Sequence, residues 1–238
     1  MNVLSIGNSF SQDAHRYINK IAKADGVELN VFNLYIGGCS LERHYRNMLS
    51  ENREYTLEMN GEDTGFNVSL KEGVLNRSWD VITIQQVSSA SVCYDKYQPY
   101  LNKIVEYIRI CCPKAIIAIH QTWAYEENSQ KLNEKMGYAH HSEMFEDVKN
   151  SYKKAFDDVN ANKLIPSGEV LQKLIANGVE KVHRDGSHLS FGIGRYATGL
   201  LWYRLLTGND VTNNSFCDFD EEISQEEIKI IKKCVMEF

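Results

Sequence analysis

The chain of 238 residues can form one large domain or two small ones, and its 43% hydrophobic and 24% charged residues are ordinary for a folded globular protein. Its 26 basic and 32 acidic side chains give a net charge of -6, so a nucleic-acid partner is not expected. No apolar run approaches the ~20 residues of a membrane-spanning helix. The N-terminus shows no secretion leader, so the chain as written is expected to be cytoplasmic; a leader removed beforehand is the alternative.

Short apolar runs predict five strands, and apolar residues at helical spacing predict the helices between them. The strands are expected at residues 3–6, 28–34, 80–84, 115–119 and 163–165. The helices are expected at residues 14–22, 40–48, 97–108, 144–159, 191–206 and 224–236. In the first helix, Ser11 is the expected N-cap and Asp13 a first-turn acid. Residues 51–68 are typical of an inserted hairpin, and residues 126–141 of a long loop or lid.

This alternation predicts one α/β domain over residues 1–238, with a parallel sheet of about five strands and helices on both faces. In such sheets, ligands bind beyond the carboxyl ends of the strands. Functional side chains are therefore expected in the four segments 7–11, 37–40, 85–89 and 120–125.

Ser9 is a candidate nucleophile because it lies at the first strand-to-helix turn, just after Gly7. Backbone N–H groups at such a turn can stabilise a developing oxyanion, and the glycine lets the chain turn tightly. The alternative is that Ser9 and Ser11 only cap the helix.

A nucleophilic serine needs a base, and the base needs an orienting carboxylate. Of the seven histidines, only His188 lies in a suggestive local pattern, three residues after Asp185 in a glycine-containing loop before a helix. One turn can then bring both side chains to one point, where Asp185 orients the ring and His188 accepts the serine proton. The alternative is a polar loop that ends in a helix cap.

Other strand ends offer hydrogen-bond donors. Gly37 and Gly38 follow the second strand, where a backbone N–H can approach a ligand closely. Gln85 and Gln86 follow the third strand, and either amide is a suitable oxyanion donor. Trp123, after the fourth strand, is either a substrate-contacting residue at the rim or a core residue.

Taken in chain order, these motifs resemble those of the SGNH, or GDSL-type, hydrolases, and the resemblance runs from Val3 to about Leu206. The sequence is similar to a bacterial branch of that superfamily whose first block reads Gly-Asn-Ser-Phe-Ser. The usual Gly-Asp-Ser is replaced by Gly-Asn-Ser, and the usual third-block asparagine by glutamine. The matching positions are Gly7-Asn8-Ser9, Gly38, Gln85-Gln86, Asp185 and His188.

The resemblance implies a flavodoxin-like three-layer α/β/α sandwich and a serine esterase that needs neither a metal nor a cofactor. It implies a triad of Ser9, His188 and Asp185. The backbone N–H groups of Ser9 and Gly38, with the amide of Gln85 or Gln86, would bind the oxyanion. The residues expected to contact substrate are Asn8, Gln86 and Trp123.

The expected reaction is hydrolysis of short-chain acyl esters, with O-acetyl groups on carbohydrate as one candidate substrate. A small molecule or a carbohydrate is therefore the expected partner. Two alternatives remain open at this point: a non-catalytic carbohydrate-binding relative that keeps the pocket, and a lipid or thioester hydrolase with the same triad.

Overall fold

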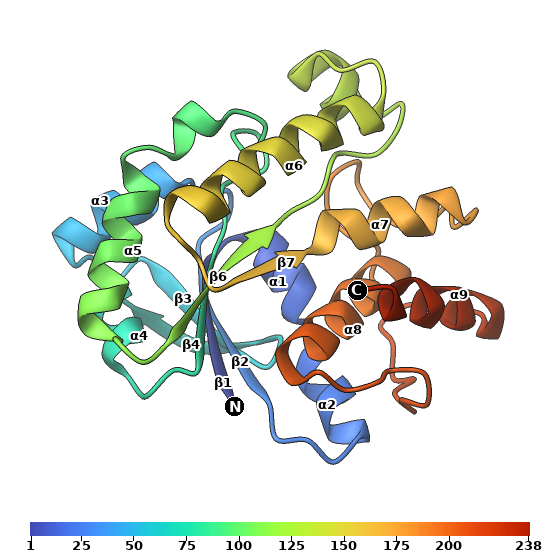
Figure 1. Ribbon diagram of the computed structural model, residues 1–238, viewed down its shortest axis with the longest axis horizontal. Coiled ribbons are helices and arrows are strands. Elements are labelled where there is room, and N and C mark those ends of the chain that lie inside the picture. Colours follow the sequence, from blue (N-terminus) through green and yellow to red (C-terminus); the bar gives the residue numbers. More distant parts are fainter.

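A computed structural model describes residues 1–238 and places seven strands in one sheet (Figure 1). Their order across the sheet is β4-β3-β2-β1-β5-β6-β7. The strands are β1 (Asn2–Gly7), β2 (Asn30–Tyr35), β3 (Tyr55–Met59), β4 (Glu62–Val68), β5 (Val81–Ile84), β6 (Ile116–Gln121) and β7 (Lys163–Pro166). Strands β2, β1, β5, β6 and β7 run parallel, which confirms the predicted parallel sheet of five strands.

The predicted hairpin adds two further strands to that sheet. Strand β3 pairs antiparallel with β2 and β4 pairs antiparallel with β3, so the complete sheet has seven strands rather than about five. Asn60 and Gly61 form the turn with φ of 54° and 83°, the left-handed backbone that a tight hairpin requires. The hairpin therefore covers the open edge of β2.

Helices cover both faces of the sheet (Figure 1), which confirms the predicted three-layer arrangement. Four helices pack on one face: α3 (Leu41–Ser50), α4 (Leu70–Leu75), α5 (Tyr100–Cys111) and α6 (His141–Asp158). The other face carries α1 (Ser9–His15), α2 (Ile18–Ala24), α7 (Ser167–Ala176), α8 (Ile193–Thr207) and α9 (Gln225–Met236). Helix α8 is buried on nearly all sides, since it packs against α1, α2, α7 and α9.

The first helical segment differs from its prediction. It forms two helices, α1 and α2, and the N-cap of α1 is Asn8 rather than Ser11. Tyr17 lies at the junction of the two helices, where its hydroxyl donates to the Phe191 carbonyl at 2.5 Å and accepts the Asp220 N–H at 2.7 Å. Helix α7 was also missed, because its short apolar pattern follows directly on β7.

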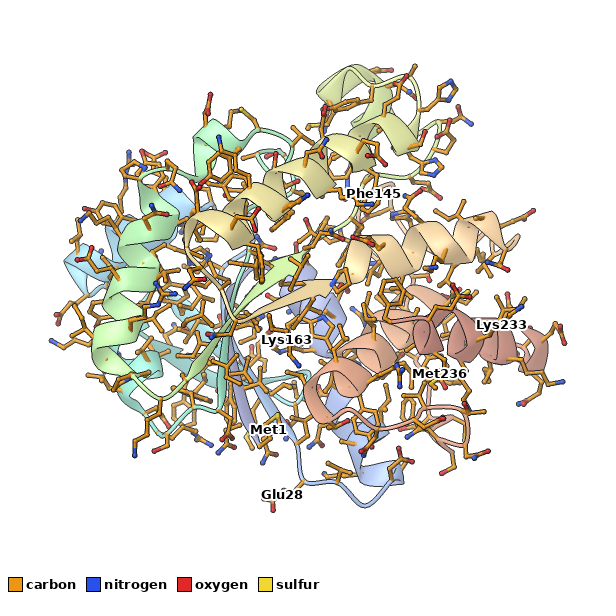
Figure 2. The ribbon with its side chains drawn as sticks, viewed as in Figure 1. Met1, Glu28, Phe145, Lys163, Lys233 and Met236 are labelled. Atoms are coloured by element: carbon orange, nitrogen blue, oxygen red, sulfur yellow. The ribbon has the colours of Figure 1, made fainter.

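The parallel strands start at one edge of the sheet and end together at the other. At the starting edge, the Met1 ammonium group donates to the Glu28 carbonyl at 2.9 Å, and Figure 2 shows both residues there. At the opposite edge, Gly7 at the end of β1 pairs with Tyr35 at the end of β2. None of the helices is long and apolar enough to cross a membrane.

Candidate active site

The turn between β1 and α1 presents Ser9 at the carboxyl edge of the sheet. Gly7 must be a glycine, because a Cβ there would lie 2.0 Å from the Ser11 Oγ. Asn8 then caps α1, its Oδ1 accepting the Phe10 N–H at 3.0 Å. Ser9 is the first residue of α1, so its N–H has no acceptor within the helix.

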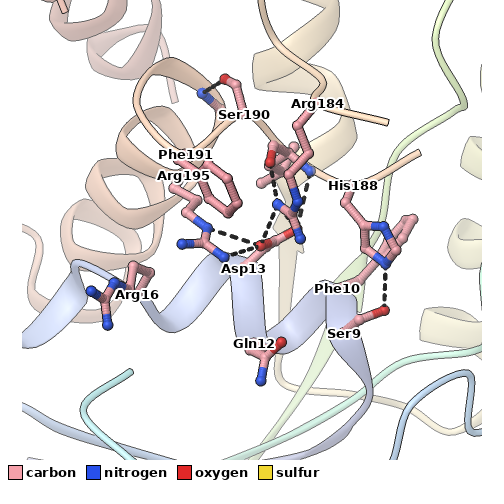
Figure 3. Close-up of polar contacts among 12 residues, drawn as sticks. Ser9, Phe10, Gln12, Asp13, Arg16, Arg184, His188, Ser190, Phe191 and Arg195 are labelled. Atoms are coloured by element: carbon pink, nitrogen blue, oxygen red, sulfur yellow. Dashed lines mark hydrogen bonds and ion pairs between the residues drawn. The ribbon is translucent and has the colours of Figure 1, made fainter. Parts of the chain in front are cut away.

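The structure brings Ser9, His188 and Asp185 together in one chain of hydrogen bonds. The Ser9 Oγ lies 2.9 Å from the His188 Nε2 (Figure 3). The His188 Nδ1 lies 2.7 Å from the Asp185 Oδ2. A carboxylate only accepts hydrogen bonds, so the proton sits on Nδ1 and leaves Nε2 free to accept the serine proton.

Several donors hold the Asp185 carboxylate in place. Its Oδ1 accepts the N–H groups of Ser187 at 3.1 Å and His188 at 3.0 Å, and the Lys131 Nζ lies 3.2 Å away. Burial favours the neutral acid, yet the hydrogen bonds from His188 and the lysine outweigh it and keep the Asp185 pKa well below its usual range. Lys131 opens a short helical segment, Lys131–Met136, inside the predicted lid.

A cavity of about 330 Å³ opens beside the Ser9 hydroxyl. Gly38 contributes to its wall with a left-handed backbone (φ 61°), and the Gly38 N–H donates to no acceptor in the protein. Both Gly38 and Ser9 can thus offer an N–H to a bound carbonyl oxygen. The residues that line the cavity are Asn8, Ser9, Phe10, Tyr35, Gly37, Gly38, Val87, Ser88, Ser187 and His188.

Gln85 lies behind this cavity, which corrects the prediction that its amide donates to an oxyanion. The side chain is 3% exposed and does not line the cavity. Its Nε2 donates to the Asn8 Oδ1 at 2.8 Å, while its Oε1 lies 2.5 Å from the His120 Nδ1. Gln85 therefore holds the helix cap that presents Ser9.

This contact belongs to a chain of buried donors that runs from α8 to the Gly38 loop. The Trp202 Nε1 donates to the Ser167 Oγ, whose hydroxyl then donates to the His120 Nε2 at 2.9 Å. The His120 Nδ1–H donates to Gln85, and Gln85 donates to Asn8. The Asn8 Nδ2 completes the chain on the Cys39 carbonyl at 3.1 Å. The protein thus fixes His120 in one neutral tautomer.

Buried neutral histidines predict that stability falls in acid. Burial lowers the pKa of His15, His44 and His120 to about 3, and that of His183 to about 4. The unfolded chain takes up these protons near pH 6.5, so the stability is complete above that pH and is lost as the pH falls towards 3 or 4. Each group contributes a slope of up to about 1.4 kcal/mol per pH unit.

We expect the free energy of urea unfolding to decrease steadily from pH 6.5 to pH 4.5. His120→Gln should make this dependence less steep, because it removes one of the four groups. The exposed His140 provides a contrast of opposite sign, because its hydrogen bond with Glu127 raises its pKa; His140→Gln should therefore leave the curve as steep or make it steeper. Equal unfolding free energies at pH 6.5 and pH 4.5 would contradict the prediction.

Two predicted substrate contacts are also corrected. Gln86 is 1% exposed: its Oε1 accepts the Leu41 N–H at 3.0 Å, and its Nε2 donates to the Lys96 carbonyl at 2.9 Å. Trp123 is likewise 1% exposed, stacks on Phe10 at 4.2 Å between ring centroids and donates to the Ser187 carbonyl. Both side chains support the walls of the site from behind and cannot contact a substrate.

Sequence reasoning missed residues that do line the cavity. Ser88, rather than either glutamine, faces it from the loop after β5, with its Oγ 2.9 Å from the Tyr125 hydroxyl. Tyr35, the last residue of β2, forms another part of the wall. The sequence offered one indication that Ser88 and Tyr35 line the cavity: both lie at or just beyond the end of a parallel strand.

Asp13 was also missed as a residue of the site. It is completely buried on α1, one turn after Ser9, and lies between the guanidinium groups of Arg184 and Arg195 (Figure 3). Its Oδ1 is 2.8 Å from a nitrogen of each arginine, and its Oδ2 accepts the Leu189 N–H at 3.0 Å. Asp13 therefore ties the helix of the nucleophile to the loop of the base.

The histidine and acidic side chains of the protein do not form a metal site. His140 and His141 both direct their Nδ1 atoms at the Glu127 carboxylate, at 2.9 Å and 2.7 Å. No group of three or more histidine, cysteine, aspartate or glutamate side chains has an arrangement that could hold a metal ion.

Comparison with known proteins links this geometry to a family. The model of a family described as "Domain of unknown function (DUF4886)" matches residues 2–237. A DUF4886 family protein from Bacteroides uniformis is 33% identical, with a TM-score of 0.93 over 100% of this chain and 93% of that one. No curated protein matches the chain.

More distant solved structures share the fold. A proposed SGNH hydrolase from Slackia heliotrinireducens is 20% identical, with a TM-score of 0.63 over 87% of this chain and 98% of that one. A mutant of an acetyl-xylooligosaccharide esterase from Geobacillus is 14% identical, with a TM-score of 0.54 over 93% and 97% of the two chains. The α/β fold is therefore that of the SGNH hydrolases, and the chain belongs to the DUF4886 family.

Proposed function

We propose that this protein is a serine esterase that hydrolyses short-chain acyl esters, O-acetyl groups on carbohydrate among them. One observation carries the proposal: the hydrogen-bond chain from Ser9 through His188 to Asp185 opens directly on a cavity. A serine with a histidine nitrogen at 2.9 Å and a carboxylate behind that histidine is arranged for nucleophilic catalysis.

The reaction follows from these positions. The Ser9 Oγ attacks the ester carbonyl carbon while the His188 Nε2 takes the hydroxyl proton, and Asp185 stabilises the resulting imidazolium. The carbonyl oxygen, now an oxyanion, accepts hydrogen bonds from the N–H groups of Ser9 and Gly38. When the intermediate collapses, His188 gives the proton to the leaving alcohol. Water then cleaves the acyl-serine ester by the same route.

The walls of the cavity favour a short acyl group. Gly37, Gly38, Val87 and Ser88 contribute backbone and small side chains to these walls, and Phe10 and Tyr35 limit their extent. A cavity of about 330 Å³ lies at the lower end of the range for small-molecule sites, roughly 300–1,000 Å³. A long hydrocarbon tail would extend beyond these walls into water.

A fluorophosphonate probe tests the nucleophile directly, because it forms a covalent bond only with an activated serine. We expect labelling of the native protein, with the modified peptide mapped to Ser9. We also expect p-nitrophenyl acetate to be hydrolysed faster than p-nitrophenyl octanoate. An absence of both labelling and hydrolysis would favour a non-catalytic binding protein, and faster hydrolysis of the octanoate would favour a lipid hydrolase.

A further inference from the structure

A second cavity lies next to the catalytic one and is not used by the triad. Its volume is about 350 Å³, and Tyr35 forms part of the wall of both cavities. On one side it is bounded by the hairpin, through Thr56 and Glu58 of β3 and the turn at Gly61. On the other side it is bounded by Gln12 of α1 and Arg195 of α8, among others. We refer to it as the hairpin cavity.

The hairpin is held firmly against α1, so this cavity exists without a ligand. The Gln12 Nε2 forms a short hydrogen bond with the Glu58 Oε1. Gly61 approaches the backbone of Arg16 so closely that a Cβ on it would lie 2.7 Å from the Arg16 carbonyl oxygen. A preformed wall lowers the entropy that a ligand must lose on binding.

The charged groups of the hairpin cavity already have partners in the protein. Arg16 pairs with Asp220 at 2.6 Å and also with Glu62. Arg195 pairs with the buried Asp13 and with Asp220. Glu58 accepts hydrogen bonds from Gln12 and, at 2.8 Å, from Asn33. Asp63, the remaining charged residue of the lining, accepts the Gly65 N–H at 2.7 Å. Because each of these charges already has a counter-charge or a donor, the cavity does not call for an ionic ligand.

Several neutral polar atoms of the hairpin cavity, by contrast, remain available to form hydrogen bonds with a ligand. The Tyr35 hydroxyl, the Thr56 Oγ1 and the Gln12 Oε1 line the cavity but make no hydrogen bond within the protein. Burial, together with the negative charge of Glu58, raises the pKa of Tyr35, so its hydroxyl stays protonated and can donate. Two hydroxyls that donate or accept and an amide oxygen that accepts match the hydroxyl groups of a ligand.

We propose that the hairpin cavity binds the alcohol part of the ester, and that this alcohol is a neutral polyhydroxylated group of the size of a sugar ring. The inference rests on the proposed esterase function, since the acyl group would lie in the catalytic cavity at Ser9. Tyr35, which borders both cavities, then lies beside the bond that is cleaved. The hairpin thus determines which alcohols the protein accepts.

Binding of sugars that carry no ester tests this inference separately from catalysis. The probes are xylotriose, cellotriose and maltotriose, titrated at millimolar concentrations and followed by NMR or calorimetry. We expect saturable binding of at least one of them to the native protein. Thr56→Val and Tyr35→Phe each remove one hydroxyl and should weaken that binding about five- to tenfold. Thr212→Val, at an exposed threonine outside both cavities, should leave it unchanged.

The outcomes separate the two proposals. Absence of binding by all three sugars, in a protein that hydrolyses p-nitrophenyl acetate, would overturn the alcohol site and leave the esterase standing. Equal binding by native protein, Thr56→Val and Tyr35→Phe would place the sugar elsewhere and also overturn it. Saturable binding of inorganic phosphate that displaces the sugar would contradict the neutral character of the site. Sugar binding without hydrolysis or fluorophosphonate labelling would support the site and refute the esterase.

Discussion

Ser9→Ala is expected to lower kcat for p-nitrophenyl acetate by about 10⁴-fold or more. The Ser9 Oγ is the only hydroxyl within hydrogen-bond reach of the His188 Nε2. No other group can take its place as the nucleophile, so only the electrostatic contribution of the N–H groups would remain. The Oγ makes no other hydrogen bond, and its loss should change the free energy of unfolding by less than about 1 kcal/mol.

A matched serine elsewhere provides the control for this experiment. Ser215 is exposed, and its hydroxyl makes no hydrogen bond in the protein. Ser215→Ala should keep the kcat of the native protein, and circular dichroism should show all three proteins equally folded. If Ser9→Ala kept a kcat within about tenfold of the native value, the hydrolysis would have to occur at another site and the assignment of the triad would fail.

The sequence predicted the strand ends well because their signal is local. Each parallel strand is a short, mainly apolar run with a glycine or a polar residue at its end or within two residues beyond it, and topology then collects the carboxyl ends at one edge. Ser9 was predicted in this way, whereas His188, 179 positions away, was predicted from its spacing to Asp185 and from the resemblance to the SGNH hydrolases. The Asp185–His188 contact was predictable as well, since it lies within one turn of the chain.

The sequence did not predict correctly which side chains point into the cavity just beyond the end of a strand. Gln85 and Gln86 were expected to face the ligand, but the chain continues and turns Ser88 into the cavity instead. Three donors and acceptors on other elements decide this orientation: Asn8, His120 and Leu41. A single sequence does not reveal such partners, because each lies on a different strand or helix.

Asp13, on a helix, is a second residue whose distant partners the sequence did not reveal. A carboxylate near a helix N-terminus is usually explained by the helix dipole, and the sequence favoured that interpretation. Its partners Arg184 and Arg195 lie 171 and 182 positions away along the chain. Only the folded arrangement of α1, α8 and the loop between residues 183 and 190 shows that this aspartate is buried between them.

Asp13→Asn is expected to destabilise the protein by about 3–5 kcal/mol, because it removes one partner of a buried ion-pair network. Asp13 is completely buried, and only 22% and 11% of the Arg184 and Arg195 side chains are exposed. An asparagine would leave the Arg184 guanidinium without a carboxylate partner, and it would turn its amide donors either to the arginines or to the Leu189 N–H. Urea unfolding at pH 7 measures this change.

Asp220→Asn is the matched control, because it makes the same chemical change at the exposed end of the same network. Asp220 pairs with Arg16 at 2.6 Å and with Arg195 at 3.2 Å, but 29% of its side chain is exposed. Solvent screens such pairs, so the loss should not exceed about 1 kcal/mol. Similar losses for the two variants would mean that burial of Asp13 is not what makes the network stabilising.

Catalysis should respond to Asp13→Asn as well, even under conditions in which the variant is fully folded. Asp13 accepts the Leu189 N–H, next to His188, and lies on the helix that begins with Ser9. When this link is lost, the base can drift relative to the nucleophile, and a displacement of about 1 Å can cost on the order of 10²-fold. The loss should appear mainly in kcat, because Gly37, Gly38, Val87 and Ser88 of the cavity wall make no hydrogen bond with Asp13 or its arginine partners. Asp13 is therefore a positioning residue: a kcat equal to that of the native protein would reduce its role to stability alone.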